Sequence, residues 1–160
     1  MKRKRRRRQQ WDIGDVFIVP QQDGLWSVGQ VIGLMDPPYG AICAFYDILC
    51  EPDCQDVATP LPFDKLISSL SVTKEALKWG EWKVIKKQQP VTLDRKHWAN
   101  EPFRERRWVG AIIHNTVVVE AFLNAFYALE AWDDYHNPNY LDSLLISPDK
   151  KPKNLILKKQ

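Results

Sequence analysis

The chain has 160 residues, of which 44% are hydrophobic and 27% are charged, a size and composition that favour one globular domain with its own core. Its formal net charge of +3 conceals an uneven distribution. Residues 1–10 hold seven of the 23 basic side chains and residues 150–160 hold five, whereas all 20 acidic side chains lie in residues 11–149. With 11 basic against 20 acidic residues, segment 11–149 carries a formal charge of −9, which disfavours phosphate ligands and favours basic partners.

The sequence also indicates the cellular compartment of the protein. No apolar run reaches the roughly 18–20 residues that a membrane span needs, so no membrane association is expected. The basic start is followed by WDIGDVF, which contains two acids and no apolar signal-peptide core, so secretion is not expected. Three cysteines (Cys43, Cys50 and Cys54) without a framework spacing are typical of a reducing cytoplasm.

The first half of the chain predicts three antiparallel strands. Apolar and β-branched runs cover residues 14–20, 25–35 and 41–49. Turn signals separate them, Asp23-Gly24 in the first gap and residues 36–40 (DPPYG) in the second. Gly29 and Gly33 indicate a bulge or bend within the middle strand, as in a curled sheet.

The second half predicts fewer and less regular elements. A loop over residues 50–62 precedes further strands at residues 63–72, 81–85 and 108–113. Thr73 is a candidate N-cap for a short helix that Gly80 would end. The main helix is expected over residues 118–132, with Phe122, Phe126 and Leu129 on one face and Leu123 and Tyr127 widening it.

These elements predict an α+β fold: a strand-rich antiparallel sheet, curled or a half-barrel, with one main C-terminal helix packed on it and one short helix. Three segments are expected: a disordered basic arm at residues 1–10, a single domain at residues 11–149, and a basic tail at residues 150–160.

The sequence places acids and aromatic residues where the main helix is expected to end. Asp133 and Asp134 stand between Trp132 and Tyr135, although the negative end of a helix dipole disfavours carboxylates. Two structural explanations are open, namely local hydrogen bonds that hold the turn around Pro138 and packing of the aromatic rings in the core. The alternative is a surface for a basic protein, because Trp and Tyr make contact area and acids steer association. The residues of that predicted surface are Trp132, Asp133, Asp134, Tyr135, Asp142, Glu51, Asp53 and Asp56.

Other chemistries find little support in the sequence. The three histidines (His97, His114 and His136) are isolated, and Cys50-x-x-x-Cys54 is half of a zinc pattern, so neither a metal nor another cofactor is expected. No nucleophile elbow or phosphate-binding glycine loop is present, so no catalytic residue is assigned and an enzyme is not expected. The basic arm could bind nucleic acid, but it lacks interleaved aromatic residues and precedes an acidic body.

The order of several motifs resembles the immunity protein 26 family of bacterial polymorphic toxin systems. The resemblance spans residues 12–148. It is carried by GDVFIVP, GLWSVGQV, AFYDI, LKWGEWKVI and FLNAFYALEAWDDYHNPNYLDSLL. It implies an α+β, cytoplasmic antitoxin that binds and neutralises the C-terminal domain of a cognate toxin, for which a nuclease is expected here. Some family members carry a phosphotriesterase-like label, so a small hydrolase is one alternative, and a nucleic-acid adaptor using the basic arm is another.

Overall fold

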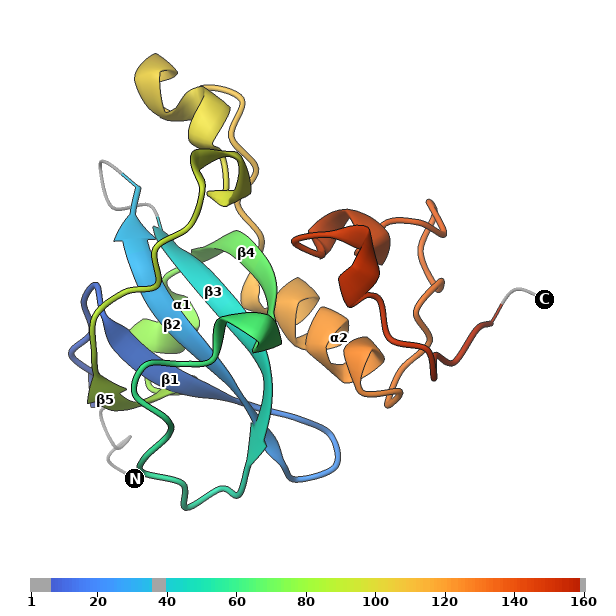
Figure 1. Cartoon of the computed structure of the whole chain (residues 1–160), viewed down its shortest axis with the longest axis horizontal. Coiled ribbons are helices and arrows are strands. Elements are labelled where there is room, and N and C mark those ends of the chain that lie inside the picture. The colour runs from blue at the N-terminus through green and yellow to red at the C-terminus, as the bar shows by residue number, and fades with distance from the viewer. Residues whose placement is uncertain (1–6, 36–39, 159–160) are drawn as a thin grey trace, which may run out of the picture.

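A five-stranded antiparallel sheet organises the molecule, with the strand order β4-β3-β2-β1-β5 (Figure 1). The computed structural model describes residues 7–35 and 40–158. The strands are β1 (Asp15–Pro20), β2 (Trp26–Leu34), β3 (Gly40–Cys50), β4 (Leu66–Thr73) and β5 (Lys83–Lys87). The described residues contain two α-helices, the single turn α1 (Glu75–Lys78) and α2 (Thr116–Phe126), together with five short 3-10 helices. The predicted strand-rich α+β class with a curled antiparallel sheet is therefore confirmed, and the sheet is not closed.

The sheet curls at irregular positions along β2. The pairing register between β2 and β3 shifts between Val31 and Gly33, as the glycine predicted, and again between Ser27 and Val28. Gly29 serves a different purpose, because a Cβ atom there would lie 2.6 Å from Cζ of Phe17. The absence of a side chain at Gly29 lets the Phe17 ring lie against the β2 backbone.

One face of the sheet packs on the two helices. Phe17 stacks on Trp82 with ring centroids 5.2 Å apart, and Phe45 meets Trp82 edge-on at 5.8 Å. The indole Nε1 of Trp82 donates a hydrogen bond to Glu120 of α2 at 3.1 Å. Phe122 of α2 is fully buried in the same cluster. This aromatic cluster ties the segment between α1 and β5 to both the sheet and α2.

Irregular segments cover the opposite face. Val16, Ile18 and Tyr46 are fully buried there beneath Leu61 and Leu93, which belong to the chain before β4 and after β5. Residues 94–113 rise from this face as 3-10 turns that project beyond the end of the sheet, at the top of Figure 1. The β-strand predicted for residues 108–113 is wrong, since they form turns and irregular backbone.

The helix limits also differ from the sequence prediction. The side chain of Asn115 accepts a hydrogen bond from the amide of Val118 at 2.9 Å, so α2 begins at Thr116. The helix ends at Phe126 rather than residue 132, because Ala128 takes a left-handed conformation with φ of 58°. The short helix is real, but Lys74 and not Thr73 precedes it, without a side-chain cap.

The end of the predicted basic arm contacts the body of the protein through Gln9. Gln9 donates from Nε2 to the carbonyls of Leu77 and Trp82, at 2.7 and 2.9 Å, and its Oε1 accepts from the amide of Val84. These contacts join residue 9 of the predicted basic arm to the segment around α1 and β5, while residues 1–6 of the arm, 36–39 of the predicted turn and 159–160 of the predicted tail lie outside the described residues.

Candidate functional site

The acidic and aromatic residues follow α2 and do not lie at its end. The turn at Ala128 reverses the chain, so that Trp132 packs on Phe122 with ring centroids 5.9 Å apart. Trp132 is 1% exposed and Asp133 is 7% exposed. We call residues 132–142 the acidic–aromatic segment. The tension between a helix dipole and the two aspartates, which the sequence suggested, does not arise in this geometry.

The chain's own C-terminus covers the acidic–aromatic segment. The amide of Trp132 donates to the carbonyl of Ile156 at 2.9 Å, and Ala131 and Ile156 form a parallel β-bridge. The amide of Lys158 donates to Oδ1 of Asp133 at 2.7 Å. These contacts hold residues 154–158, which we call the C-terminal strap, in an extended conformation beside the segment (Figure 1).

Lysine side chains complete the contact between the C-terminus and the segment. Nζ of Lys158 lies 3.1 Å from Oδ1 of Asp134, with both side chains more than half exposed. Oδ1 of Asp142 accepts from Nε1 of Trp132 and from Nζ of Lys151, each at 2.9 Å. Burial alone would raise the pKa of Asp142, but the hydrogen bonds from Lys151 and Trp132 outweigh it and the pKa is lowered.

Both structural explanations offered by the sequence apply to this segment. Core packing accounts for Trp132, and the rings of Tyr135 and Tyr140 lie 5.2 Å apart in half-buried positions. A local hydrogen bond from the amide of Asn139 to the side chain of Asn137 holds the turn around Pro138, at 3.0 Å. The prediction of an exposed ring surface is therefore wrong for Trp132, and Asp133 is not an open contact residue while the strap is in place.

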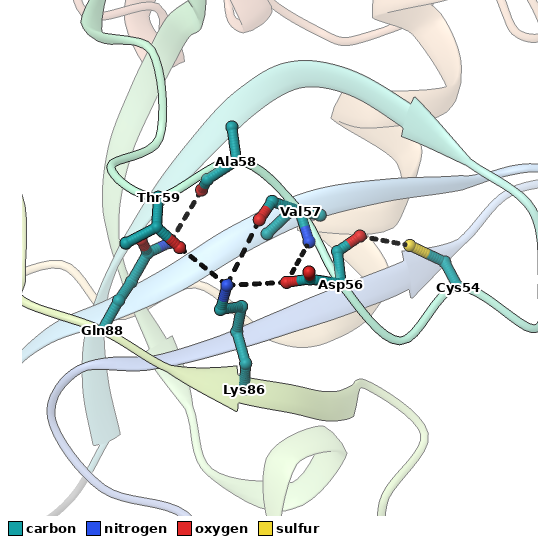
Figure 2. A network of polar contacts seen from close by, with 7 residues as sticks. All are labelled: Cys54, Asp56, Val57, Ala58, Thr59, Lys86 and Gln88. Atoms are coloured by element: carbon teal, nitrogen blue, oxygen red, sulfur yellow. Dashed lines mark hydrogen bonds and ion pairs between the residues drawn. The ribbon is translucent and has the colours of Figure 1, made fainter.

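The acids of the 50–62 loop lie elsewhere. Glu51, Asp53 and Asp56 are exposed in the loop at the bottom of Figure 1, well separated from the C-terminal strap at its right. Asp56 accepts from Nζ of Lys86 at 2.6 Å, and this hydrogen bond is the main reason that its pKa is lowered (Figure 2). The eight predicted contact residues thus form two sites and not one surface.

A third surface, which was not predicted from the sequence, lies on residues 94–113. The guanidinium of Arg104 lies 5.7 Å from the ring centroids of both Trp98 and Trp108. Val109 and Ile112 on this segment are 72% and 64% exposed. The available signal was the concentration of Arg and Trp between residues 95 and 108, part of which was interpreted as leading into a strand at residues 108–113.

Cysteine and histidine positions give no metal centre in the described part of the chain. No three His, Cys, Asp or Glu side chains among residues 7–35 and 40–158 are grouped so that they could hold a metal ion. Burial, followed by a hydrogen bond with Cys54, raises the pKa of Cys50 to about 12, so this thiol stays protonated at neutral pH. None of the helices in those same ranges is long and apolar enough to cross a bilayer.

Comparisons with known proteins leave the family open. No protein-family model, no curated protein and no solved structure matches the chain.

Proposed function

We propose that this chain is an immunity protein that binds a cognate bacterial toxin domain in the cytoplasm and neutralises it by occlusion, without turnover. The observation that carries the proposal is the way the acidic–aromatic segment receives the C-terminal strap. That segment holds an extended, lysine-bearing peptide through backbone pairing and carboxylate contacts, with Lys158 set against Asp133 and Asp134. A toxin that binds phosphate with Lys and Arg would offer the same chemistry.

The contacts of the C-terminal strap are weak enough for a basic partner to displace it. Ile156 and Leu157 are 46% and 51% exposed, and Leu155 is the only apolar side chain of the described strap that is half-buried against the core. The Lys158–Asp134 ion pair is exposed on both sides, and such pairs contribute about 0–1 kcal/mol. A basic partner with several cations could therefore displace the strap. Its apparent affinity would equal its intrinsic affinity multiplied by the fraction of molecules in which the strap is not bound.

The acidic loop would then add long-range attraction. Glu51 and Asp53 are exposed and lie in a body with a formal charge of −9. Exposed charges accelerate encounter with a basic protein and lose this effect as salt rises. In this mechanism the loop steers the toxin and the acidic–aromatic segment holds it.

Co-expression tests the function itself. The C-terminal domain of a large secreted protein encoded beside this chain would be induced in a bacterial host, with and without this chain. Survival only in the presence of the chain, together with a stable complex of the two purified proteins, is the expected result. Full toxicity in the presence of folded chain would contradict the proposal.

A charge reversal tests where the toxin binds. Asp134→Lys changes an exposed side chain and should weaken the complex about 10-fold, because it replaces an attraction by a repulsion. Lys158→Ala removes the ion pair between the strap and Asp134 but keeps the backbone hydrogen bonds of the strap. Because the strap then competes less well, the complex should become up to about fivefold tighter. Glu105→Lys, an exposed acid on the projecting turns, is the matched control and should change nothing. Equal affinity of wild type and Asp134→Lys would place the contact elsewhere.

A further inference from the structure

A cavity of about 430 Å³ lies on the face of the sheet opposite α2. Gln30 of β2 and Tyr46 of β3 line it from the sheet. One wall is residues 60–63, before β4, and the other is residues 89–92, just after β5. Its volume falls within the range of small-molecule sites, about 300–1,000 Å³.

Both walls are fixed before any ligand arrives. Pro60, Pro62 and Pro90 stiffen them, since proline restricts the backbone. Gln30 holds the second wall, because its Nε2 donates to the carbonyls of Gln88 and Gln89 and its Oε1 accepts from the amide of Val91.

A polar network ties the bases of the two walls together (Figure 2). Nζ of Lys86, at the end of β5, donates to Asp56 at 2.6 Å and to Oγ1 of Thr59 at 2.7 Å. Nε2 of Gln88 donates to the carbonyl of Ala58 at 3.4 Å. The segment leading into the first wall is therefore bonded to the segment leading into the second, which makes the cavity preorganised.

One buried polar group beside the cavity lacks a partner. Tyr46 is fully buried, and its hydroxyl makes no hydrogen bond to any described residue. Burial raises the pKa of Tyr46 to about 12, so the group is a neutral hydroxyl that can donate. Enclosed hydroxyls are usually hydrogen-bonded because leaving them unpaired is unfavourable, so Tyr46 matches a ligand with an acceptor atom.

The rim and the lining define the rest of the ligand. Phe63 at the rim is 61% exposed, so its ring is free to pack on an apolar ligand in the cavity. No Asp, Glu, Lys, Arg or His side chain lines the cavity among the described residues, so a charged ligand would lose its hydration without gaining a counter-ion.

We propose that this cavity binds a small neutral molecule in which a flat apolar ring carries one hydrogen-bond acceptor, such as a carbonyl oxygen. The ring lies between the proline-bearing walls beneath Phe63, and the acceptor atom accepts a hydrogen bond from the Tyr46 hydroxyl. This site is distinct from the acidic–aromatic segment and does not depend on the proposed immunity function.

A matched pair of fragments tests the proposal on the full chain. Acetophenone has the ring and the acceptor, ethylbenzene has the same carbon skeleton without the oxygen, and benzoate has a charge. Titrations followed by amide NMR should show acetophenone shifting the signals of Leu61, Phe63 and Val91. Ethylbenzene should bind about fivefold or more weakly, the loss expected for one hydrogen bond, and benzoate should not bind.

Two variants decide which group is responsible. Tyr46→Phe removes only the hydroxyl and should weaken acetophenone about fivefold while leaving ethylbenzene unchanged. Phe63→Ala, on the exposed rim, should weaken both fragments and keeps the test decisive if Tyr46→Phe folds poorly. Absence of acetophenone shifts in the wall residues of the wild type would overturn the site, and equal acetophenone affinity of Tyr46→Phe and wild type would overturn the role of the hydroxyl.

Discussion

At the scale of single residues, Asp142 shows why local reasoning about the acidic–aromatic segment gave the wrong surface. Its carboxylate accepts from Trp132, ten residues earlier, and from Lys151, nine residues later. The sequence could indicate that Trp132 is either buried or a contact residue, because tryptophan serves in both ways. It could not indicate which cation Asp142 pairs with, since that pairing depends on how the C-terminus returns.

Asp142 should make the free energy of unfolding depend on pH in the acidic range. Its pKa is lowered in the folded chain, so its contribution is complete above the unfolded value of about 4 and is lost as pH falls through the folded pKa. Asp142→Asn keeps an acceptor for the Trp132 indole but loses the ion pair, and we expect about 1 kcal/mol less stability at pH 7. Urea unfolding followed by tryptophan fluorescence at pH 7 and pH 3 measures both effects. The difference between variant and wild type should shrink at pH 3, and an unchanged difference would contradict this assignment.

At the scale of elements, the sequence predicted what depends on local alternation and missed what depends on single backbone turns. Strands β1, β2 and β3 follow their apolar runs and their turn signals, and the register shift at Gly33 lies where the glycine suggested. The end of α2 was placed too late because the apolar spacing continues through Leu129. Only the left-handed conformation of Ala128 ends the helix, and alanine carries no sequence signal for it.

Asn100 should control whether the projecting turns of residues 94–113 stay attached to the sheet. Its side chain donates to Oγ of Ser71 and to the carbonyl of Ile112, both at 2.7 Å, and accepts from the amide of Ile112 at 2.9 Å. It also has a φ of 59°, which asparagine tolerates better than alanine. Asn100→Ala should therefore lower the free energy of local opening by about 2 kcal/mol.

Limited trypsin digestion measures that opening, because Arg104, Arg106 and Arg107 are exposed on these turns. Asn100→Ala should be cut at least several times faster than wild type. Asn100→Gly is the control that accepts the positive φ but lacks the side chain, so its rate separates the hydrogen bonds from backbone strain. If Asn100→Gly and wild type were cut equally fast, the three hydrogen bonds would not be what holds the turns.

At the scale of the whole molecule, the charge distribution explains why the basic C-terminus contacts the body. A body with a formal charge of −9 between two basic ends should attract those ends, and the structure brings Lys151 and Lys158 onto carboxylates of the body. The sequence indicated residues 150–160 only as a separate basic tail and gave them no contact with the body. The backbone hydrogen bond between Trp132 and Ile156 determines where the tail docks. It belongs to a β-bridge between residues 25 positions apart, and no local sequence pattern predicts such a bridge.

Docking of the C-terminal strap should therefore respond to salt while the sheet does not. Raising NaCl from about 0.05 M to about 0.5 M shortens the screening length roughly threefold and weakens the exposed Lys158–Asp134 pair. Hydrogen exchange at the amides of Trp132 and Lys158 should then become faster, whereas exchange within β1 and β2 should stay the same because those bonds join buried backbone.

Lys158→Gln isolates the side-chain charge in that experiment. The variant keeps the backbone bond to Asp133, so its strap amides should exchange faster than wild type at low salt and respond less to added salt. Strap exchange that ignores salt in the wild type would mean that backbone pairing alone holds the C-terminus. A basic partner would then have to compete with hydrogen bonds and not with charge, and Lys158→Ala would lose its predicted effect on the complex.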